Sequence, residues 1–196
     1  MTNTASPPRI AGILLAAGAG SRFGGGKLLH PLEGVAIGVR AARNMLAAGL
    51  PVTAVVRPGS DELTRLLQAE GVDVTVCANA ADGMGVSLAH VIGHTQKAQG
   101  WVVALADMPR IRPATMQHVA DAVRGGALIA APQFQGERGH PVGFGAGLLD
   151  ELLACRGDEG ARAVIKRHHA DIQWLPVDDP GVIFDIDRKE DVPPPL

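Results

Sequence analysis

Short apolar runs alternate with longer amphipathic segments along this chain, and that alternation is what most constrains its fold. The run Trp101–Ala106 is uninterrupted and is bounded by Gly100 and Asp107, which predicts a buried strand. Strands that are apolar throughout and are separated by helices are typical of a mostly parallel sheet covered on both faces. The sequence therefore predicts an α/β protein, a three-layer α/β/α sandwich around a Rossmann-like sheet.

The same patterns give approximate bounds for each element. The expected strands are Ile10–Leu15, Val52–Val56, Val72–Val76, Trp101–Ala106, Leu128–Ala131, Pro141–Gly145, Ile172–Leu175 and Val182–Phe184. The expected helices are Val35–Leu50, Asp61–Glu70, Gly85–Ala98, Pro113–Val123, Gly147–Ala154 and Gly160–His168. With 196 residues, the chain predicts a single domain over 1–196, with a flexible N-terminus at 1–9 and a tail at 192–196.

Charge and composition narrow the classes of partner. The formal net charge is −2, only 3% of residues are aromatic and no Tyr is present, so neither nucleic acid nor a membrane surface is an expected partner. Two separated cysteines and a polar N-terminal segment without a signal-peptide pattern predict a cytoplasmic protein. Small molecules are the expected ligands.

A glycine-rich segment, Ala16–Lys27, follows the first expected strand. Glycines let backbone amides approach phosphate oxygens, and Arg22 and Lys27 add two positive charges. In open α/β sheets ligands bind at the carboxyl ends of the strands, where this segment lies. The segment therefore predicts a cradle for a triphosphate, with Arg22 and Lys27 offsetting the charge of a departing pyrophosphate.

Other interpretations of the segment fit less well. A Walker-type P-loop requires glycine where Ser21 stands and Ser or Thr where Leu28 stands, so it is excluded. A dinucleotide-binding turn lacks its third glycine, at Phe23, and its acidic ribose partner, at Arg57. A flexible surface loop with incidental charges remains an alternative.

Acidic residues follow two of the expected strands. Asp107 comes directly after Trp101–Ala106, and Asp185 and Asp187 follow Val182–Phe184, where strand alternation would point both to the same side. Magnesium prefers a few carboxylates together with phosphate oxygens and water, so Asp107 with Asp187 or Asp185 predicts a Mg²⁺ site. The alternative is that these aspartates cap helices or form turns.

Three further segments carry candidate binding residues. In Asn79–Leu88, Gly83 and Gly85 precede a helix whose first amides can contact a nucleotide, and Ser87 adds a hydroxyl. The second segment is Arg138–Pro141, in which Arg138 can bind an acceptor phosphate and His140 can hydrogen-bond to it. The same residues are equally compatible with a polar hairpin turn that has no binding role.

In the third segment, Asp158 is expected to cap the following helix, while Arg162 lines the acceptor side. The alternative for the glycines of the first segment is an ordinary glycine-assisted helix start.

Together these segments resemble the MobA-like nucleotidyltransferases, and in particular the molybdenum cofactor cytidylyltransferase branch. The matching patterns are L-A-A-G-x-G-x-R-x-G-x-x-K, G-M-G-x-S-L, L-A-D-x-P, R-G-H-P, D-x-G-A-R and a late D-x-D, in family order from Leu15 to Asp187. The resemblance implies a sheet of the nucleotide-diphospho-sugar transferase type. It also implies Mg²⁺-dependent transfer of CMP from CTP to the phosphate of molybdopterin, with a molybdoenzyme or its chaperone as protein partner.

The resemblance assigns roles to individual residues. Lys27, Arg22 and Asp107 are the implied catalytic residues, Arg138, His140 and Arg162 bind the acceptor, and Asp107 with Asp187 or Asp185 holds the metal. The implied nucleotide-binding residues are Leu15, Ala16, Ala17, Gly18, Gly20, Lys27, Asn79, Gly83, Gly85 and Ser87.

Some positions depart from the family pattern. Phe23 stands where the family usually has Met, Gly34–Ile37 replaces a glycine–proline turn, and Asp187–Asp191 replaces D-T-P-E-D. These departures bear on the acceptor, for which a sugar or alcohol phosphate is the alternative. The motifs are also less specific for CTP than for the family, so another nucleoside triphosphate is an alternative donor. Two rival functions are a dinucleotide-dependent oxidoreductase, which the basic Arg57 disfavours, and a non-catalytic cofactor chaperone.

Overall fold

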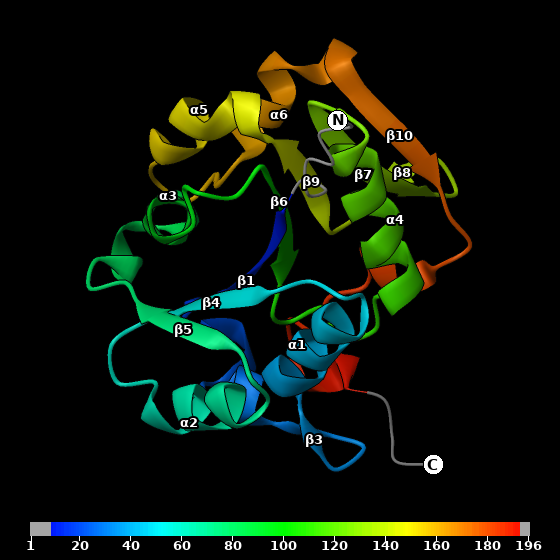
Figure 1. Cartoon of the computed structure of the whole chain (residues 1–196). Coiled ribbons are helices and arrows are strands. Elements are labelled where there is room, and N and C mark those ends of the chain that lie inside the picture. The colour runs from blue at the N-terminus through cyan, green and yellow to red at the C-terminus, as the bar shows by residue number, and fades with distance from the viewer. Residues whose placement is uncertain (1–8, 193–196) are drawn as a thin grey trace, which may run out of the picture.

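The computed structural model describes residues 9–192, which are arranged around an eight-stranded sheet (Figure 1). The strand order is β5-β4-β1-β6-β9-β7-β10, and β8 pairs with β7. Within this sheet β9 runs antiparallel to β6 and β7, β8 runs antiparallel to β7, and the other neighbouring pairs are parallel. The strands are β1 (Ile10–Ala16), β4 (Val52–Val56), β5 (Asp73–Val76), β6 (Gly100–Leu105), β7 (Ile129–Phe134), β8 (Glu137–Arg138), β9 (Val142–Gly145) and β10 (Ile172–Pro176).

Helices cover both faces of this sheet (Figure 1), which confirms the predicted three-layer, mostly parallel α/β architecture. One face carries α1 (Ile37–Ala47), α2 (Asp61–Ala69) and α4 (Pro113–Arg124), and the other carries α3 (Met84–His94), α5 (Leu149–Leu153) and α6 (Arg162–Arg167). The side chains of β1 alternate between the two cores, Ile10 and Leu14 on one side and Ala11 and Ile13 on the other. This division explains why the run is apolar at every position.

Short 3₁₀ helices connect these elements, at Ser21–Phe23, Lys27–Leu29, Ala80–Asp82, Ala146–Leu148, His169–Asp171, Pro180–Ile183 and Lys189–Asp191.

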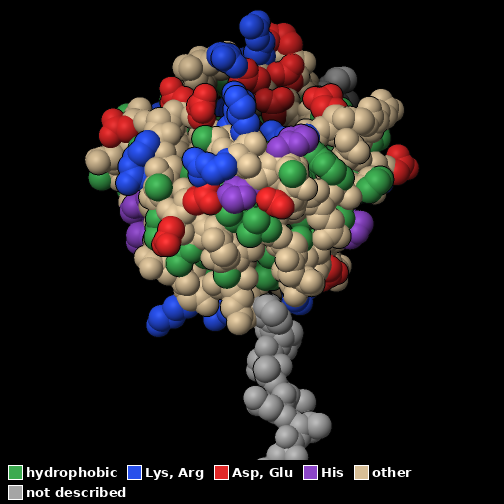
Figure 2. Space-filling view, turned by 90° about the horizontal axis from the view of Figure 1, so that it is seen from above, with side chains coloured by type: hydrophobic (Ala, Val, Ile, Leu, Met, Phe, Trp, Pro, Cys, Tyr) green, Lys and Arg blue, Asp and Glu red, His purple; other side chains and the backbone are tan. Residues whose placement is uncertain are grey.

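Over α5 and α6, acidic, basic and histidine side chains are interspersed (Figure 2), and Glu151 pairs there with Arg167 and His168. No helix in residues 9–192 is long and apolar enough to cross a membrane.

A small hairpin precedes α1, where a continuous helix over Val35–Leu50 was expected. The strands β2 (Pro31–Leu32) and β3 (Val35–Ala36) pair antiparallel across Glu33 and Gly34, which both have positive φ. Two consecutive left-handed residues form the tight turn that suits a two-residue hairpin. The helix therefore begins at Ile37 rather than Val35, and it ends at Ala47.

The predicted strand Val182–Phe184 is wrong, because the structure has a 3₁₀ helix at Pro180–Ile183 instead. Asp179 begins this helix, with one carboxylate oxygen accepting a hydrogen bond from the Gly181 amide at 3.1 Å. Its other oxygen accepts from the Arg112 amide at 2.9 Å and from the Thr115 hydroxyl at 2.6 Å. The buried carboxylate thus turns the chain and ties it to the start of α4.

Asp158 does not cap α6, contrary to expectation, since that helix begins at Arg162 and its cap position is Ala161. Gly157 and Gly160, both with positive φ, carry the chain through an additional turn before the helix.

The remaining predicted elements are found with ends shifted by a few residues. The predicted flexible N-terminus and tail lie largely outside the described residues.

The Asp179 carboxylate gives a test of this anchoring. Asp179→Ala is expected to lower the free energy of unfolding by about 3 kcal/mol, because three donors lose their acceptor in a buried position. Urea denaturation measures this difference. Asp178→Ala is the matched control, because that side chain is exposed. An equal, small effect of both substitutions would contradict the anchoring role.

Candidate active site

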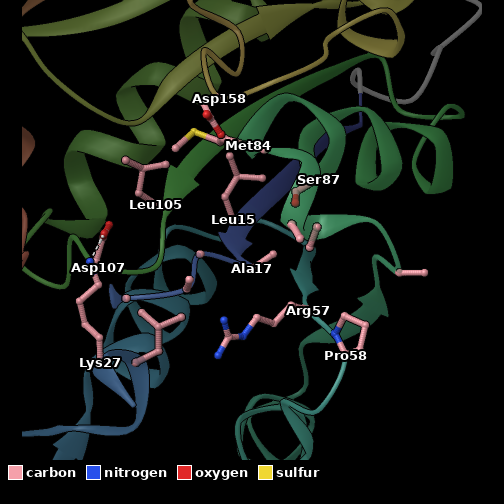
Figure 3. Close-up of a pocket in the computed structure, with 18 residues that line it drawn as sticks. Leu15, Ala17, Lys27, Arg57, Pro58, Met84, Ser87, Leu105, Asp107 and Asp158 are labelled. Carbon is pink, nitrogen blue, oxygen red and sulfur yellow. Dashed lines mark hydrogen bonds and ion pairs between the residues drawn. The ribbon is translucent and has the colours of Figure 1, made fainter. Parts of the chain in front are cut away.

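A cavity of about 730 Å³ opens at the carboxyl ends of β1, β4 and β6 (Figure 3). Its walls come from the glycine-rich loop after β1, from Arg57 directly after β4, from the start of α3, and from Asp107 after β6. Its volume lies within the range of about 300–1,000 Å³ that is usual for small-molecule sites. Its position agrees with the expectation that ligands bind beyond the strand ends.

The glycine-rich loop is folded back tightly and is anchored by one apolar side chain. Gly20 has φ 60°, a left-handed conformation, and its carbonyl accepts from the amides of Phe23 at 3.1 Å and Gly25 at 3.2 Å. The Phe23 ring is buried in a small cluster with Leu32 and Ile186. This anchoring disfavours the flexible-surface-loop alternative.

A cluster of opposite charges lies beside the loop. Lys27 Nζ is 2.7 Å from Asp107 Oδ2 and 3.7 Å from Asp187 Oδ1, and Arg22 Nη1 is 2.7 Å from Asp187 Oδ2. The hydrogen bond from Arg22 holds the pKa of Asp187 below its ordinary value, and the charges of Arg22 and Lys27 add to this shift. Two carboxylates from distant segments therefore converge on one ammonium group.

Backbone contacts explain why these carboxylates meet. The Ile186 amide donates to the carbonyl of Asp107 at 2.9 Å, while the Ile186 side chain packs in the Phe23 cluster. Because Arg22 precedes Phe23 and Asp187 follows Ile186, this apolar contact brings the charged neighbours together. Sequence reasoning predicted Asp187 as a metal ligand, but it noted the rest of the segment, Arg188–Asp191, only as part of a departure from the family pattern.

The last aspartate of that segment has a positioning role that was not predicted. Asp191 Oδ2 accepts from the amides of Asp187 at 2.9 Å and Arg188 at 2.7 Å, which fixes the turn that presents Asp187. Asp185 is exposed and forms no ion pair with the described Lys, Arg or His side chains. The geometry therefore favours Asp187 over Asp185 as the partner of Asp107.

The carboxylates suit a hard cation only if a ligand contributes further oxygens. Residues 9–192 contain no group of three or more His, Cys, Asp or Glu side chains placed to hold a metal ion. However, Asp107 and Asp187 already converge on a cation, the Lys27 ammonium. Magnesium commonly takes one or two carboxylates and completes its coordination with phosphate oxygens and water, so this pair fits a Mg²⁺ bound with a triphosphate.

Most of the predicted nucleotide-binding residues line the cavity, and three do not. Those that line it are Leu15, Ala17, Gly18, Gly20, Lys27, Gly83 and Ser87. Ala16 instead packs in the core, and Asn79 precedes the 3₁₀ turn at Ala80–Asp82. A Cβ on Gly85 would lie 2.6 Å from the Arg156 carbonyl oxygen, so this glycine allows α3 to contact the loop before α6.

Arg57 is a lining residue that sequence reasoning missed as a binding group. It was considered only as a mismatch to a dinucleotide-binding turn, yet its guanidinium extends into the cavity opposite the glycine-rich loop (Figure 3). The sequence feature that could have identified Arg57 as a binding residue is its position directly after the apolar run Val52–Val56, at the carboxyl end of an expected strand. With Lys27, it gives the cavity cationic groups on two walls.

A second, smaller cavity of about 160 Å³ adjoins the first, and Leu15, Met84, Leu105 and Asp158 line both. The three predicted acceptor-binding residues, Arg138, His140 and Arg162, all line this second cavity. The structure therefore brings together segments that are separate in sequence, next to the first cavity.

Two polar atoms at the second cavity have no partner. Arg138 Nη1 and His140 Nδ1 are buried without a hydrogen bond to the described residues. Burial, and then the nearby charge of Arg162, lower the pKa of Arg138. Burial, and then the charge of Arg138, lower the pKa of His140 to about 4, so its imidazole is neutral at pH 7.

Two curated relatives resemble this chain along nearly its whole length. Nicotine blue oxidoreductase from Paenarthrobacter nicotinovorans is 29% identical over 198 aligned positions that cover 93% of this chain and 94% of the relative. Purine catabolism protein PucB from Bacillus subtilis is 28% identical, with 94% of each chain covered.

Solved structures share the fold. Rv0371c from Mycobacterium tuberculosis is 26% identical, with 95% of this chain and 96% of that chain covered and a TM-score of 0.80. A structure of the same protein in complex with manganese covers 93% of this chain and 95% of that chain, with 26% identity and a TM-score of 0.77. A nucleotidyl transferase from Methanothermobacter thermautotroptrophicus, 23% identical, covers 93% and 94% with a TM-score of 0.81, which shows the nucleotidyltransferase fold.

The family comparison agrees with the geometry. The model of the MobA-like NTP transferase domain matches residues 12–172, which include the glycine-rich loop, Asp107 and the residues of the second cavity. The late acidic segment lies beyond the matched range, although its Asp187 reaches back to Lys27 and Arg22. On this match, the chain belongs to the MobA-like NTP transferase family.

Proposed function

We propose that this protein is a magnesium-dependent nucleotidyltransferase that transfers CMP from CTP to the phosphate of molybdopterin and releases pyrophosphate. The family and the fold support nucleotidyltransferase activity in general. The observation that carries the proposal is the convergence of Lys27, Asp107 and Asp187 at the rim of the nucleotide-sized cavity.

The triphosphate lies along the glycine-rich loop in this proposal. Backbone amides between Ala16 and Gly20 contact its phosphate oxygens, and Lys27, Arg22 and Arg57 supply positive charge. Gly83 and Ser87, at the start of α3, line the far wall and contact the nucleoside. Lys27 and Arg22 exchange their carboxylate partners for phosphate oxygens when the nucleotide binds.

Catalysis then rests on alignment and charge neutralisation. An oxygen of the acceptor phosphate attacks the α-phosphorus, and the bond to the β-phosphate oxygen breaks as pyrophosphate leaves. The nucleophile is already anionic, so no general base is needed. Lys27 and Arg22 stabilise the charge that develops on the pyrophosphate. Asp107 and Asp187 would hold the magnesium ion, which reduces repulsion between the phosphate groups when it is bound.

The acceptor occupies the second cavity in this proposal, with Arg138, His140 and Arg162 as its binding residues. Because the two cavities share Leu15, Leu105 and Asp158, an acceptor held there can extend its phosphate toward the nucleotide. Molybdopterin as the acceptor and CTP as the donor rest on the sequence patterns, and neither curated relative is named for them. The alternatives are another nucleoside triphosphate and a sugar or alcohol phosphate.

An oxidoreductase is the second candidate function, because one relative is named as an oxidoreductase of nicotine blue. The basic Arg57 at the end of β4 disfavours the dinucleotide-binding mode, in which an acidic residue binds the ribose. A non-catalytic chaperone would bind the same ligands without turnover.

Cytoplasmic localisation and a molybdoenzyme or its chaperone as protein partner remain predictions.

Pyrophosphate release with molybdopterin, magnesium and each nucleoside triphosphate in turn tests the proposal. CTP is expected to give the highest kcat/KM, and Asp107→Ala is expected to lower the rate by at least about a hundredfold, because it removes a group that neutralises charge at the reacting phosphates. Thermal unfolding is expected to show that the variant remains folded.

Asp73→Ala is the matched control, since Asp73 is an exposed carboxylate on β5, away from the cavity. It is expected to retain the full rate. Full activity in Asp107→Ala would overturn the assignment of Asp107. Hydride transfer, or binding without pyrophosphate release from any triphosphate, would favour the rival functions.

A second prediction separates the two late aspartates. Asp187→Asn is expected to raise the magnesium concentration that gives the half-maximal rate by about tenfold, because only Asp187 converges with Asp107 on a common cation. Asp185→Asn, which changes an exposed carboxylate two residues away, is expected to raise it much less. The reverse order of effects would assign the metal to Asp185.

A further inference from the structure

The second cavity combines apolar walls with two polar groups that have no partner. Leu88, Val103 and Phe144 contribute to its walls, and Arg138 and His140 line it. An unpaired buried donor or acceptor costs free energy, so two of them beside one cavity indicate a site built for a ligand.

The backbone between these residues is held in place. Arg138, the last residue of β8, and His140 flank Gly139, and both residues line the second cavity. Gly139 faces Val182 closely, since a Cβ there would lie 2.6 Å from the Val182 Cβ. Hydrogen bonds from the Gly139 amide to the Pro132 carbonyl and from the His140 amide to the Val182 carbonyl, each 2.8 Å, hold the segment.

The size of the cavity limits what it can hold. A cavity of about 150 Å³ lined by Leu, Ile and Phe takes one benzene ring in another protein. The present cavity, at about 160 Å³, therefore suits one planar ring or the end of a bicyclic ring, and is too small for a nucleotide.

The unpaired groups define the edge of that ring. Arg138 can only donate hydrogen bonds, and the neutral His140 imidazole has one donor and one acceptor nitrogen. In the tautomer that carries its proton on Nε2, the unpaired Nδ1 of His140 is a hydrogen-bond acceptor. A ligand then meets a donor next to an acceptor, which a carbonyl next to an N–H satisfies.

An acceptor phosphate, the group that the sequence patterns suggested for Arg138, fits this cavity less well. A reacting phosphate must reach the nucleotide beside Lys27 and Asp107, and neither residue lines the second cavity. The carboxylates of Asp158 and Glu159 lie on the walls and would repel a dianion.

We propose that the second cavity binds the ring end of the acceptor, a planar nitrogen heterocycle, and recognises its lactam edge through Arg138 and His140. This inference rests on the proposed function, in which the phosphate end of the same acceptor extends into the first cavity. The pterin ring of molybdopterin carries such an edge.

Calorimetric titration of the full chain with isolated heterocycles, without nucleotide or metal, tests this proposal. Pterin and hypoxanthine carry the lactam, while 2,4-diaminopteridine and adenine have the same ring sizes with an amino group in place of the carbonyl. The lactam compounds are expected to bind at least about tenfold more tightly than their amino counterparts. Equal affinities within each pair would overturn the proposal, as would tighter binding of benzoate or inorganic phosphate than of hypoxanthine.

Variants identify the residues responsible. Arg138→Met and His140→Phe, which keep the bulk but remove the polar atoms, are expected to weaken hypoxanthine binding by at least about tenfold. Arg65→Met, which changes an exposed arginine on α2, is expected to bind as the unmodified protein does. Unchanged affinity in Arg138→Met would contradict the assignment.

Thermal unfolding of the ligand-free variant distinguishes binding from a structural role. Arg138→Met is expected to unfold at a temperature equal to or above that of the unmodified protein, because it removes a half-buried cation that forms no ion pair with the described carboxylates. Markedly lower stability would mean that Arg138 supports the fold instead. Because these experiments need no turnover, lactam selectivity without pyrophosphate release would refute the proposed function and leave this inference standing.

Discussion

The interaction on which the site depends is the sharing of one ammonium group by two carboxylates. Lys27 comes from the glycine-rich loop, Asp107 lies 80 residues further along the chain, and the Arg22–Asp187 pair spans 165 residues. Two carboxylates this close repel each other unless a cation lies between them. The chain thus holds the two carboxylates together with its own lysine, and in the proposed function a nucleotide with its metal takes the place of that lysine.

Apolar and backbone contacts hold this charged cluster in position. The Phe23–Ile186 contact brings the loop and the late segment together, the Ile186 amide binds the Asp107 carbonyl, and Asp179 ties the segment before it to α4. Arg138, by contrast, forms no ion pair with the described carboxylates, and its Nη1 atom has no hydrogen-bond partner. Proteins commonly tolerate unsatisfied polar groups where a ligand later satisfies them. The well-anchored charged cluster and the unpaired groups of the second cavity therefore both indicate ligand binding in this part of the structure.

Much of this arrangement could be predicted from local sequence. Apolar runs such as Trp101–Ala106 identified the strands, and the residues that follow strand ends, such as Lys27 and Asp107, identified the cavity, because the carboxyl ends of parallel strands meet at one edge. Contacts between distant segments could not be read in this way. The strand expected at Val182–Phe184 failed because Asp179 bonds to residues more than sixty positions away, and Asp158 faces the cavities instead of capping a helix.

The most direct test of the shared-cation account is a crystal structure of the protein with manganese and a non-hydrolysable CTP analogue. The account predicts an anomalous peak between the carboxylates of Asp107 and Asp187, in contact with the triphosphate, with the Lys27 ammonium moved onto a phosphate oxygen. A peak bound to neither carboxylate, or a triphosphate bound away from the glycine-rich loop, would contradict it.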